Sequence, residues 1–518
     1  MYCNFEEAVI IISRLFQNYN TSKSYSFSDI SKNYAYKTEL NKAVDLGIIE
    51  GKTNGKFEPY SNLKRSEGAK MLKKILELYG HKDEEKSVLS IAEDYFFNGT
   101  SSLSIAREKE DASFKEKYIS YAKSLGVNVS KNISNAKFNL LSLANNIAEY
   151  EVTYDVTFTT TYSDGDIKTK AYNGVTIINL LRKNGQWKVY HTNENLFLKE
   201  KVNLTWEIFI NPPSYAPYGV NVISPTWFEL TTDNSYKNSY SVYSDSSLNL
   251  YITDKSTQKY VDYAKTNDYD LWIAYRNDFN KYNTEKFLKN EYSKDKALKI
   301  VIEGVLKSKA EGINLDFENM TNKYDYSRHV REVVLASHAL GLITSVDITK
   351  YDKTSLSWSM CFDRDYIGKI CDYTALMAYD EYGAHSTKSG SNASLSWVEN
   401  SIKTTLNEVE SKKLILGVPF YVRYWQEKNN KVIKTSAISM ERANEIIKEN
   451  NAQKVIKDGQ YVATWQKDGY TYTIYLEDAF SIQNKVNLVN KYNLSGVASW
   501  RRGFETSNIW KTINDTLQ

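Results

Sequence analysis

Three polar side chains stand two residues apart in one short segment of the chain. The segment runs from Gly312 to Asn319, and Asn314, Asp316 and Glu318 alternate in it with isoleucine, leucine and phenylalanine. Residues two apart on a strand share a face, so we expect a polar row on one side and an apolar row on the other. The same alternation also fits a half-exposed strand whose polar face is solvated.

The two carboxylates of this row suit acid–base chemistry. Burying Asp316 beneath Glu318 is costly unless the charges are used or paired. Two close carboxylates raise the pKa of one of them, and a general acid at neutral pH needs such a raised pKa. The segment therefore predicts a catalytic acid at Glu318.

From about residue 199 onward, short apolar runs alternate with helical patterns, as in an α/β fold. Eight parallel strands over about 320 residues fit a (β/α)8 TIM barrel with an insertion. In such a barrel the polar row points inward, and Glu318 lies at the C-terminal mouth, where barrel active sites are found. The expected strands are Val202–Phe209, Val220–Leu230, Asp270–Arg276, Gly312–Glu318, Leu342–Ile348, Tyr373–Tyr379, Leu414–Tyr421 and Gly496–Trp500.

The stretch between Tyr421 and Gly496 is too long for one connecting helix. It contains a helical pattern at Met440–Glu449 and strand-like runs at Gln460–Gln466 and Tyr470–Leu476. We expect an inserted α+β lobe at about 424–478 that forms one wall of a cleft.

Two further domains are expected before the barrel. Residues 1–81 show helical spacing at 5–16, 37–46 and 65–78, which predicts a small all-helical module. Residues 85–198 begin with helical patterns and continue with alternating strands joined by a hairpin turn at Asp164-Gly165, which predicts an α+β domain. Its expected helices are 88–97 and 114–125, and its expected strands are 150–158, 175–181 and 185–191.

Composition excludes several classes of protein. With 42% apolar and 25% charged residues, the chain is neither disordered nor a disulfide scaffold. The 66 basic and 63 acidic residues leave a net charge of +3, which does not indicate a nucleic-acid partner. No apolar run reaches the roughly 18 residues of a membrane span, and no signal peptide is recognisable at the acidic start. Cys3, Cys361 and Cys371 leave the redox compartment open.

Motifs for other chemistries are weak or absent in the sequence. Gly47 to Thr53 has only three residues between its glycines and follows a helix, so it does not fit a phosphate-binding loop. The five histidines show no i, i+4 pair, and no Gly-x-Ser-x-Gly elbow occurs. The 41 tyrosines and 10 tryptophans are compatible with surfaces that stack on sugars, although Tyr-rich strands explain most of them.

The carboxylate segment is part of a wider resemblance. Glu311 to Glu318 resembles the Asp-x-x-Asp-x-Asp-x-Glu signature of glycoside hydrolase family 18, with Glu311 and Asn314 in place of its first two Asp residues. Segments that resemble the family's sixth, seventh and eighth strands follow in the right order at 376–380, 416–421 and 496–500. The segments 221–228, 316–319 and 500–505 resemble the bacterial subgroup associated with spores and cell walls.

This resemblance implies a glycosidase that cleaves a β-1,4 bond next to an N-acetylated sugar, with the substrate's own acetamido group as nucleophile. Glu318 would be the acid and base, Asp316 would orient the acetamido group, and Tyr379 would donate to its carbonyl oxygen. Asn314 in place of an Asp would shorten the proton relay proposed for chitinases. No metal or organic cofactor is implied. The expected substrate-binding residues are Asn314, Met377, Asp380, Trp500, Trp227, Tyr421 and Arg423.

The substrate class is left open at this level. Peptidoglycan of a cell wall or spore cortex is the expected polysaccharide, and chitin is the first alternative. A carbohydrate-binding surface or spore-coat protein on a catalytically idle barrel is the second. Such a protein would keep Trp500 and Trp227 but would not need Glu318.

The N-terminal parts carry resemblances of their own. Residues 27–78 resemble an S-layer homology repeat, and residues 4–17 resemble the closing helix of a preceding copy. Such modules bind anionic wall polymers through an Arg, which Arg65 matches, so the resemblance implies a cell-surface, cell-wall or spore location. The alternative is a small helical packing domain. Residues 85–198 are similar to the cone-shaped NTF2-like domains that serve as spacers.

Overall fold

The computed structural model describes residues 4–16, 19, 21–52, 55–79, 82–99, 104–144 and 146–517. The chain separates into two compact units. One consists of Met1–Glu108, Phe138–Glu151 and Ile177–Thr192, and the other of Lys109–Lys137, Val152–Thr176 and Asn193–Gln518. Cys3, His81 and Thr53 of the sequence analysis lie outside the described residues.

The N-terminal part of the first unit is helical, as predicted, with α1 (Phe5–Leu15), α2 (Lys37–Asp45) and α3 (Arg65–Tyr79). Phe5, Leu40, Phe57 and Met71 belong to one buried apolar cluster that these segments share. The loop before α3 is fixed by Asp29, whose carboxylate accepts hydrogen bonds from the backbone N–H groups of Phe57 and Glu58 at 2.8 and 2.7 Å. Arg65 is exposed at the start of α3.

The next elements are α4 (Lys82–Asn98), α5 (Ala106–Ser124) and an antiparallel sheet in the order β1-β2-β3-β4. The strands are β1 (Asn128–Leu143), β2 (Ile147–Thr161), β3 (Ile167–Lys183) and β4 (Gln186–Phe197). The predicted helices followed by strands are present, but the sequence analysis missed β1. In that strand polar residues take most positions, so its alternation is weak. The NTF2-like resemblance stays a prediction.

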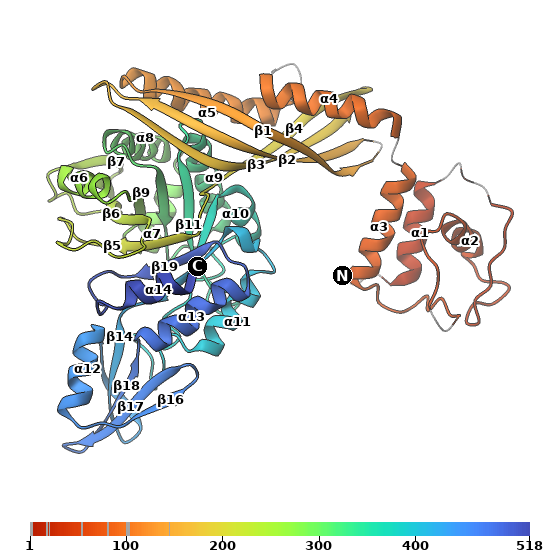
Figure 1. Cartoon of the computed structure of the whole chain (residues 1–518). Coiled ribbons are helices and arrows are strands. Elements are labelled where there is room, and N and C mark those ends of the chain that lie inside the picture. Colours follow the sequence, from red (N-terminus) through yellow and green to blue (C-terminus); the bar gives the residue numbers. More distant parts are fainter. Residues whose placement is uncertain are drawn as a thin grey trace. The chain divides into compact units, whose positions relative to one another are not determined.

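A closed parallel barrel forms the main part of the second unit, which confirms the predicted fold class (Figure 1). Its eight described strands pair in the order β5-β19-β13-β12-β11-β10-β9-β6, and β5 also pairs with β6 to close the ring. They are β5 (Val202–Glu207), β6 (Val222–Thr231), β9 (Asp270–Asn277), β10 (Gly312–Asp316), β11 (Ile343–Thr349), β12 (Tyr373–Met377), β13 (Leu414–Pro419) and β19 (Gly496–Trp500).

The last strand meets the first at a glycine. Gly496 pairs with Val202 in the β19–β5 register, and a Cβ atom at this position would overlap the carbonyl oxygen of Val202. A side chain here would therefore force the two strands apart. The close approach of the two strands thus explains why a glycine stands at the start of the eighth strand.

Helices surround the barrel (Figure 1). Their starts follow ordinary capping chemistry. At α13, the Asp478 carboxylate accepts from the backbone N–H of Ser481, and the Ser481 hydroxyl oxygen accepts from the backbone N–H of Asp478. The helices are α6 (Gln258–Thr266), α7 (Lys281–Leu288), α8 (Glu291–Lys307), α9 (Lys323–Ala339), α10 (Arg364–Ile370), α11 (Leu395–Thr405), α13 (Ala479–Lys491) and α14 (Ile509–Leu517).

The predicted insertion is present between β13 and β19 as an antiparallel sheet with helix α12 (Met440–Glu449) packed against it (Figure 1). The sheet order is β15-β14-β18-β17-β16. The strands are β14 (Val422–Lys428), β15 (Lys431–Ile438), β16 (Lys454–Lys457), β17 (Gln460–Lys467) and β18 (Tyr470–Leu476). A hairpin of β7 (Ser239–Ser244) and β8 (Asn249–Asp254) extends β6.

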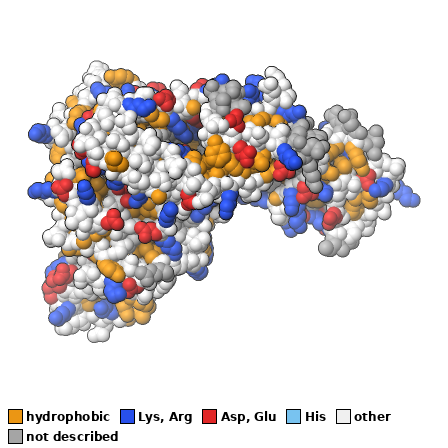
Figure 2. All heavy atoms as spheres, turned by 45° about the horizontal axis from the view of Figure 1, so that its top comes forward, with side chains coloured by type: hydrophobic (Ala, Val, Ile, Leu, Met, Phe, Trp, Pro, Cys, Tyr) orange, Lys and Arg blue, Asp and Glu red, His pale blue; other side chains and the backbone are white. Residues whose placement is uncertain are grey.

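Cys361 and Cys371 are buried free thiols. None of the helices in the described part of the chain combines the length and apolar character that a bilayer crossing requires. On the face shown in Figure 2, lysine and arginine side chains are interspersed with acidic ones.

Candidate active site

Strand β10 carries the polar row predicted from the sequence. Ile313 and Leu315 are fully buried in the apolar core, while Asn314 and Asp316 alternate with them on the opposite face. The strand ends at Asp316 rather than at Glu318, so Glu318 lies in the loop that follows the C-terminal end of the strand. Both Asp316 and Glu318 are partly exposed. The row therefore runs from the barrel interior to its mouth.

Asn277, at the end of β9, holds the backbone of Glu318. Its Oδ1 accepts from the Glu318 N–H at 3.0 Å, and its Nδ2 donates to the Glu318 carbonyl at 2.7 Å. Nδ2 also donates to the hydroxyl of Thr284 at 2.8 Å. No sequence pattern pointed to Asn277, because it lies 41 residues before Glu318 and meets it only across neighbouring strands.

Asn314 does not fit the predicted role in substrate binding. Its side chain is 1% exposed, and its Oδ1 accepts from Trp206 Nε1 at 2.8 Å and from the Ser224 hydroxyl at 3.1 Å. Its Nδ2 donates to the Ser345 hydroxyl at 3.0 Å and to Asp347 Oδ1 at 2.8 Å. Both the oxygen and the nitrogen of the Asn314 amide are thus bonded to protein groups. Asn314 supports the site from inside the barrel.

Asp347, on β11, is a third carboxylate near these two acids, and no sequence pattern pointed to it. It is 1% exposed, and burial together with the nearby Asp316 and Glu318 raises its pKa well above the ordinary value. The hydrogen bond from Asn314 opposes that rise. The apolar run around Asp347 gave no signal of its function, since a single Asp in a strand is uninformative without its spatial neighbours.

Burial and mutual repulsion set the protonation of the two predicted catalytic acids. Burial raises the pKa of Asp316 to about 6, while the guanidinium of Arg276 favours its charged form. Burial raises the pKa of Glu318 well above its usual range, with Asp316 and Asp380 adding to the rise. Arg276 is itself fixed by Glu229 at 2.7 Å. This order of pKa values favours a protonated Glu318 beside an ionised Asp316 near neutral pH.

One carboxylate oxygen of Asp316 has no hydrogen-bond partner among the described residues. Its Oδ1 is buried and accepts no hydrogen bond from any group in the described part of the chain. A buried carboxylate oxygen normally finds a donor, and leaving it unpaired costs free energy. A ligand N–H or O–H group can supply that donor.

A cleft of about 340 Å³ opens over Glu318 at the mouth of the barrel. Three other predicted site residues line it, namely Met377, Tyr379 and Asp380, which follow each other at the end of β12. Residues that the sequence analysis did not single out also line the cleft, among them Lys350, Trp358 and Trp397. The cleft therefore joins an acid to aromatic rings that can stack on sugars.

Tyr421 and Arg423 converge on Asp380. The Tyr421 hydroxyl and Arg423 Nη2 donate to Asp380 Oδ1 at 2.7 and 2.8 Å. The ring of Tyr421 packs edge-on against that of Tyr379, with centroids 6.3 Å apart. These residues of the inserted segment thus hold Asp380, and through ring packing Tyr379, at the cleft.

The two predicted tryptophans have different environments. Trp500, at the end of β19, is partly exposed and packs edge-on against Trp206. Trp227 is 1% exposed and packs against Tyr260 in the apolar core, so the prediction that it binds substrate is wrong. A register irregularity between Thr226 and Phe228 interrupts the alternation of β6, and it leaves both Trp227 and Phe228 in the core.

Glu311 has a structural use at the opposite end of β10. Its Oε2 accepts from the backbone N–H of Leu271 at 2.8 Å, and the carboxylate forms an ion pair with Lys168. Asp270 forms a similar pair with Lys170 at 2.5 Å. A cavity of about 470 Å³ lies beside these groups, but its buried charges are already paired. We do not assign a catalytic function to this cavity.

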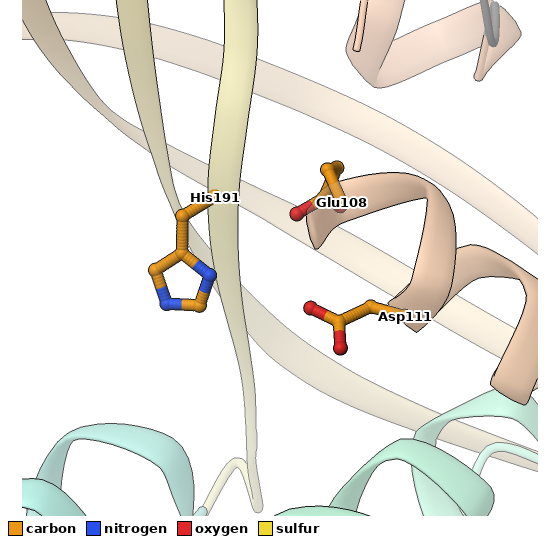
Figure 3. Close-up of side chains that lie close together, drawn as sticks. All are labelled: Glu108, Asp111 and His191. Carbon is orange, nitrogen blue, oxygen red and sulfur yellow. The ribbon is translucent and has the colours of Figure 1, made fainter. Parts of the chain in front are cut away.

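A separate group of titratable side chains lies near the start of α5. Figure 3 shows Glu108 on α5 and His191 on β4, with Asp111 one turn after Glu108 on the same helix. Both oxygens of Glu108 are already used: Oε1 accepts from the hydroxyls of Tyr95 and Thr192, and Oε2 accepts from the backbone N–H of Thr192 at 3.0 Å. We attribute the burial of Glu108 to these contacts.

Comparisons with known proteins agree with this geometry. Residues 277–505 match the family model "Glycosyl hydrolases family 18", and residues 26–67 match the S-layer homology domain. An uncharacterized glycosylase of Bacillus subtilis, YvbX, is 26% identical over 276 residues, which are 51% of this chain and 79% of the relative. The cortical fragment-lytic enzyme of the same organism is 27% identical over 243 residues, covering 44% of this chain and 54% of the relative.

Solved structures show the same fold. The chitinase of Chromobacterium violaceum superposes with a TM-score of 0.52 at 17% identity, over 61% of this chain and 99% of that one. The spore cortex-lytic enzyme SleL of Bacillus megaterium gives a TM-score of 0.51 at 19% identity, over 65% and 78% of the two chains. The barrel thus shares its fold with these proteins, and the family 18 match follows the S-layer homology match along the chain.

Proposed function

We propose that the barrel hydrolyses a β-1,4 bond next to an N-acetylated sugar in peptidoglycan, and that the S-layer homology domain associates the enzyme with the cell wall. The observation that carries this proposal is the pair of acids at the cleft. Glu318 has a strongly raised pKa, and Asp316 beside it has an unpartnered oxygen. The family 18 match implies a polysaccharide substrate.

In the first step, Glu318 donates its proton to the glycosidic oxygen as the bond to the anomeric carbon breaks. The carbonyl oxygen of the substrate's acetamido group bonds to that carbon and closes an oxazolinium ring. Asp316 Oδ1 accepts the acetamido N–H and stabilises the positive charge that develops on the ring. Tyr379 donates a hydrogen bond to the acetamido carbonyl oxygen and orients it for attack.

In the second step, the Glu318 carboxylate accepts a proton from water, and the water oxygen attacks the anomeric carbon. The oxazolinium ring opens and restores the acetamido group. Two displacements at the same carbon retain its configuration. The group that forms the intermediate belongs to the substrate, so the enzyme needs no second carboxylate across the sugar.

Asp347 and Asn314 support this cycle from below. Asn314 donates a hydrogen bond to Asp347. Asp347 is buried beneath the reacting acids, so it does not contact the substrate. Its raised pKa favours a protonated Asp347 at neutral pH, which reduces repulsion against the ionised Asp316. We assign Asp347 as a positioning residue.

Two observations bear on the alternatives. An idle sugar-binding barrel does not require an acid with a raised pKa at an open cleft, whereas an enzyme does. Chitinases and spore cortex-lytic enzymes share the fold, so the fold does not choose between chitin and peptidoglycan.

The deciding experiment is incubation of the full chain with purified peptidoglycan, spore cortex and chitin, followed by identification of the new reducing-end sugar. We expect N-acetylated reducing ends from peptidoglycan or cortex, and their loss in Glu318→Gln. Release from chitin alone would exclude peptidoglycan as the substrate. Equal release by Glu318→Gln would exclude the assigned acid.

A further inference from the structure

Lys350 is a cation placed among acids at the cleft. It directly follows β11, is half-buried, and lines the same cleft as Glu318. The other charged residues among the described lining are the acids Glu318, Asp352 and Asp380. The presence of a single cation among these acids of the described lining therefore calls for a functional explanation.

The side chain of Lys350 makes no ion pair within the part of the chain that the structure describes. None of the salt bridges among the described residues includes it, and its Nζ lies over the ring of Trp397 at 5.4 Å from the centroid. Its backbone is fixed, because its carbonyl accepts from the Ser359 hydroxyl at 2.8 Å and from Arg364 Nη2 at 3.2 Å. The lysine thus extends from a fixed backbone. Its charge helps to lower the pKa of Asp352, but its ammonium group makes no ion pair with a described residue.

The cation that favours ionisation of the catalytic acids is Arg276, on a different strand. Lys350 is therefore not required to tune the acid. Near it, the indole of Trp358 is 44% exposed on the cleft lining, and Trp397 lines the same cleft. Aromatic rings offer faces for sugars, and an ammonium group in the same cleft can recognise an acidic substituent on a sugar.

We propose that Lys350 binds a carboxylate carried by the substrate, so that the cleft prefers an N-acetylated glycan whose sugars bear acidic substituents over a neutral one. In peptidoglycan the lactyl carboxyl of muramic acid is joined to the stem peptide as an amide, so the free lactyl carboxylate is present where that peptide has been removed. Chitin lacks the lactyl group altogether. The inference deepens the proposed function and rests on its assignment of the cleft as the substrate site.

The test is a binding measurement that does not depend on turnover. The full chain carrying Glu318→Gln is titrated calorimetrically with three tetrasaccharides: one with free lactyl carboxylates on alternate sugars, the same one with those carboxylates converted to amides, and chitotetraose. Lys350→Met is then compared with Lys353→Met in that background. Lys353 is exposed three residues further on and does not line the cleft.

We expect the carboxylate form to bind more tightly than the amide form, and Lys350→Met to weaken it by about tenfold at low salt. The amide form and chitotetraose should change by less than about twofold, and Lys353→Met should change none of the three. Equal weakening of all three ligands by Lys350→Met, no weakening of the carboxylate form, or no preference for it would overturn the inference. Because binding is read directly, a failed hydrolysis assay would contradict the proposed reaction alone.

Discussion

Asn277 grips the backbone of Glu318 from both sides, accepting its N–H at 3.0 Å and donating to its carbonyl at 2.7 Å. The catalytic acid lies beyond the last hydrogen-bonded residue of its strand, so this amide replaces the missing ladder bonds. The direction in which the Glu318 carboxyl points therefore depends on a residue of the neighbouring strand.

The first prediction concerns these two hydrogen bonds between Asn277 and the Glu318 backbone. Asn277→Ala should lower kcat by roughly tenfold with little change in KM, because a small displacement of the acid weakens proton transfer more than ground-state binding. The check is steady-state kinetics on a soluble oligosaccharide together with the thermal unfolding midpoint. A rise in KM with unchanged kcat would contradict a positioning role.

The second prediction is the pH dependence of the reaction. Asp316 must be ionised and Glu318 protonated, so kcat/KM should fall below about pH 6 as Asp316 takes up a proton. It should fall again on the alkaline side as Glu318 loses its proton. Asp380→Asn removes a charge that raises the pKa of Glu318, so the alkaline limb should move to lower pH by roughly half a unit.

The measurement is kcat/KM across the pH range for the wild type and for Asp380→Asn. An unmoved alkaline limb, or one that moves upward, would show that Glu318 is not the group titrating there.

The same raised pKa values also affect the stability of the fold. The folded state binds more protons than the unfolded one above the ordinary carboxyl pKa, so these acids make the fold less stable as pH rises through about 6.

The barrel was predictable because short strand-like runs alternate with helical patterns over the whole second half of the chain. Three elements begin at the predicted residues, namely β10 at Gly312, the insertion helix α12 and the strand β18. The sequence analysis failed where alternation is interrupted. The register irregularity at Trp227 turned a presumed cleft residue into a core residue, and the polar composition of β1 hid a long strand.

From the residue pattern alone, only the part of the candidate site that lies on one segment was predictable, whereas Met377, Tyr379 and Asp380 came from the family resemblance. Asp316 and Glu318 stand on one short run, and their pattern indicates acid chemistry directly. Asp347 and Asn277 join them from neighbouring strands, and strand neighbours become visible only in the folded barrel. Asn314 shows the opposite error: its place in the polar row indicated substrate contact, but its amide is saturated by protein groups.

The third prediction concerns wall association. Arg65→Ala should reduce sedimentation of the full chain with purified cell walls severalfold, since an exposed guanidinium suits an anionic polymer. Cleavage of a small soluble substrate should stay unchanged. Lys70→Ala, an exposed lysine on the same helix, is the matched control. Equal sedimentation of all three proteins would remove Arg65 from the wall-binding site.

The fourth prediction separates substrate assistance from a protein nucleophile. A thiazoline analogue of N-acetylglucosamine should inhibit as a mimic of the oxazolinium ring, and Asp316→Asn should weaken that inhibition by about tenfold or more. The measurement is the inhibition constant for both proteins. A covalent glycosyl-enzyme trapped by a fluorinated sugar, seen as added mass on any Asp or Glu, would show that the mechanism is wrong.

The central claim is that Glu318 donates the proton that breaks the glycosidic bond, and Glu318→Gln tests it most directly. The amide fits the same volume but cannot donate that proton, so turnover of purified peptidoglycan should fall at least about 10²-fold. The unfolding midpoint of the variant and its affinity for the tetrasaccharides should match those of the wild type. Turnover is measured by the release of new reducing ends. Loss of activity with an intact fold is the predicted result, and a variant that retains more than about a tenth of wild-type turnover would contradict the account.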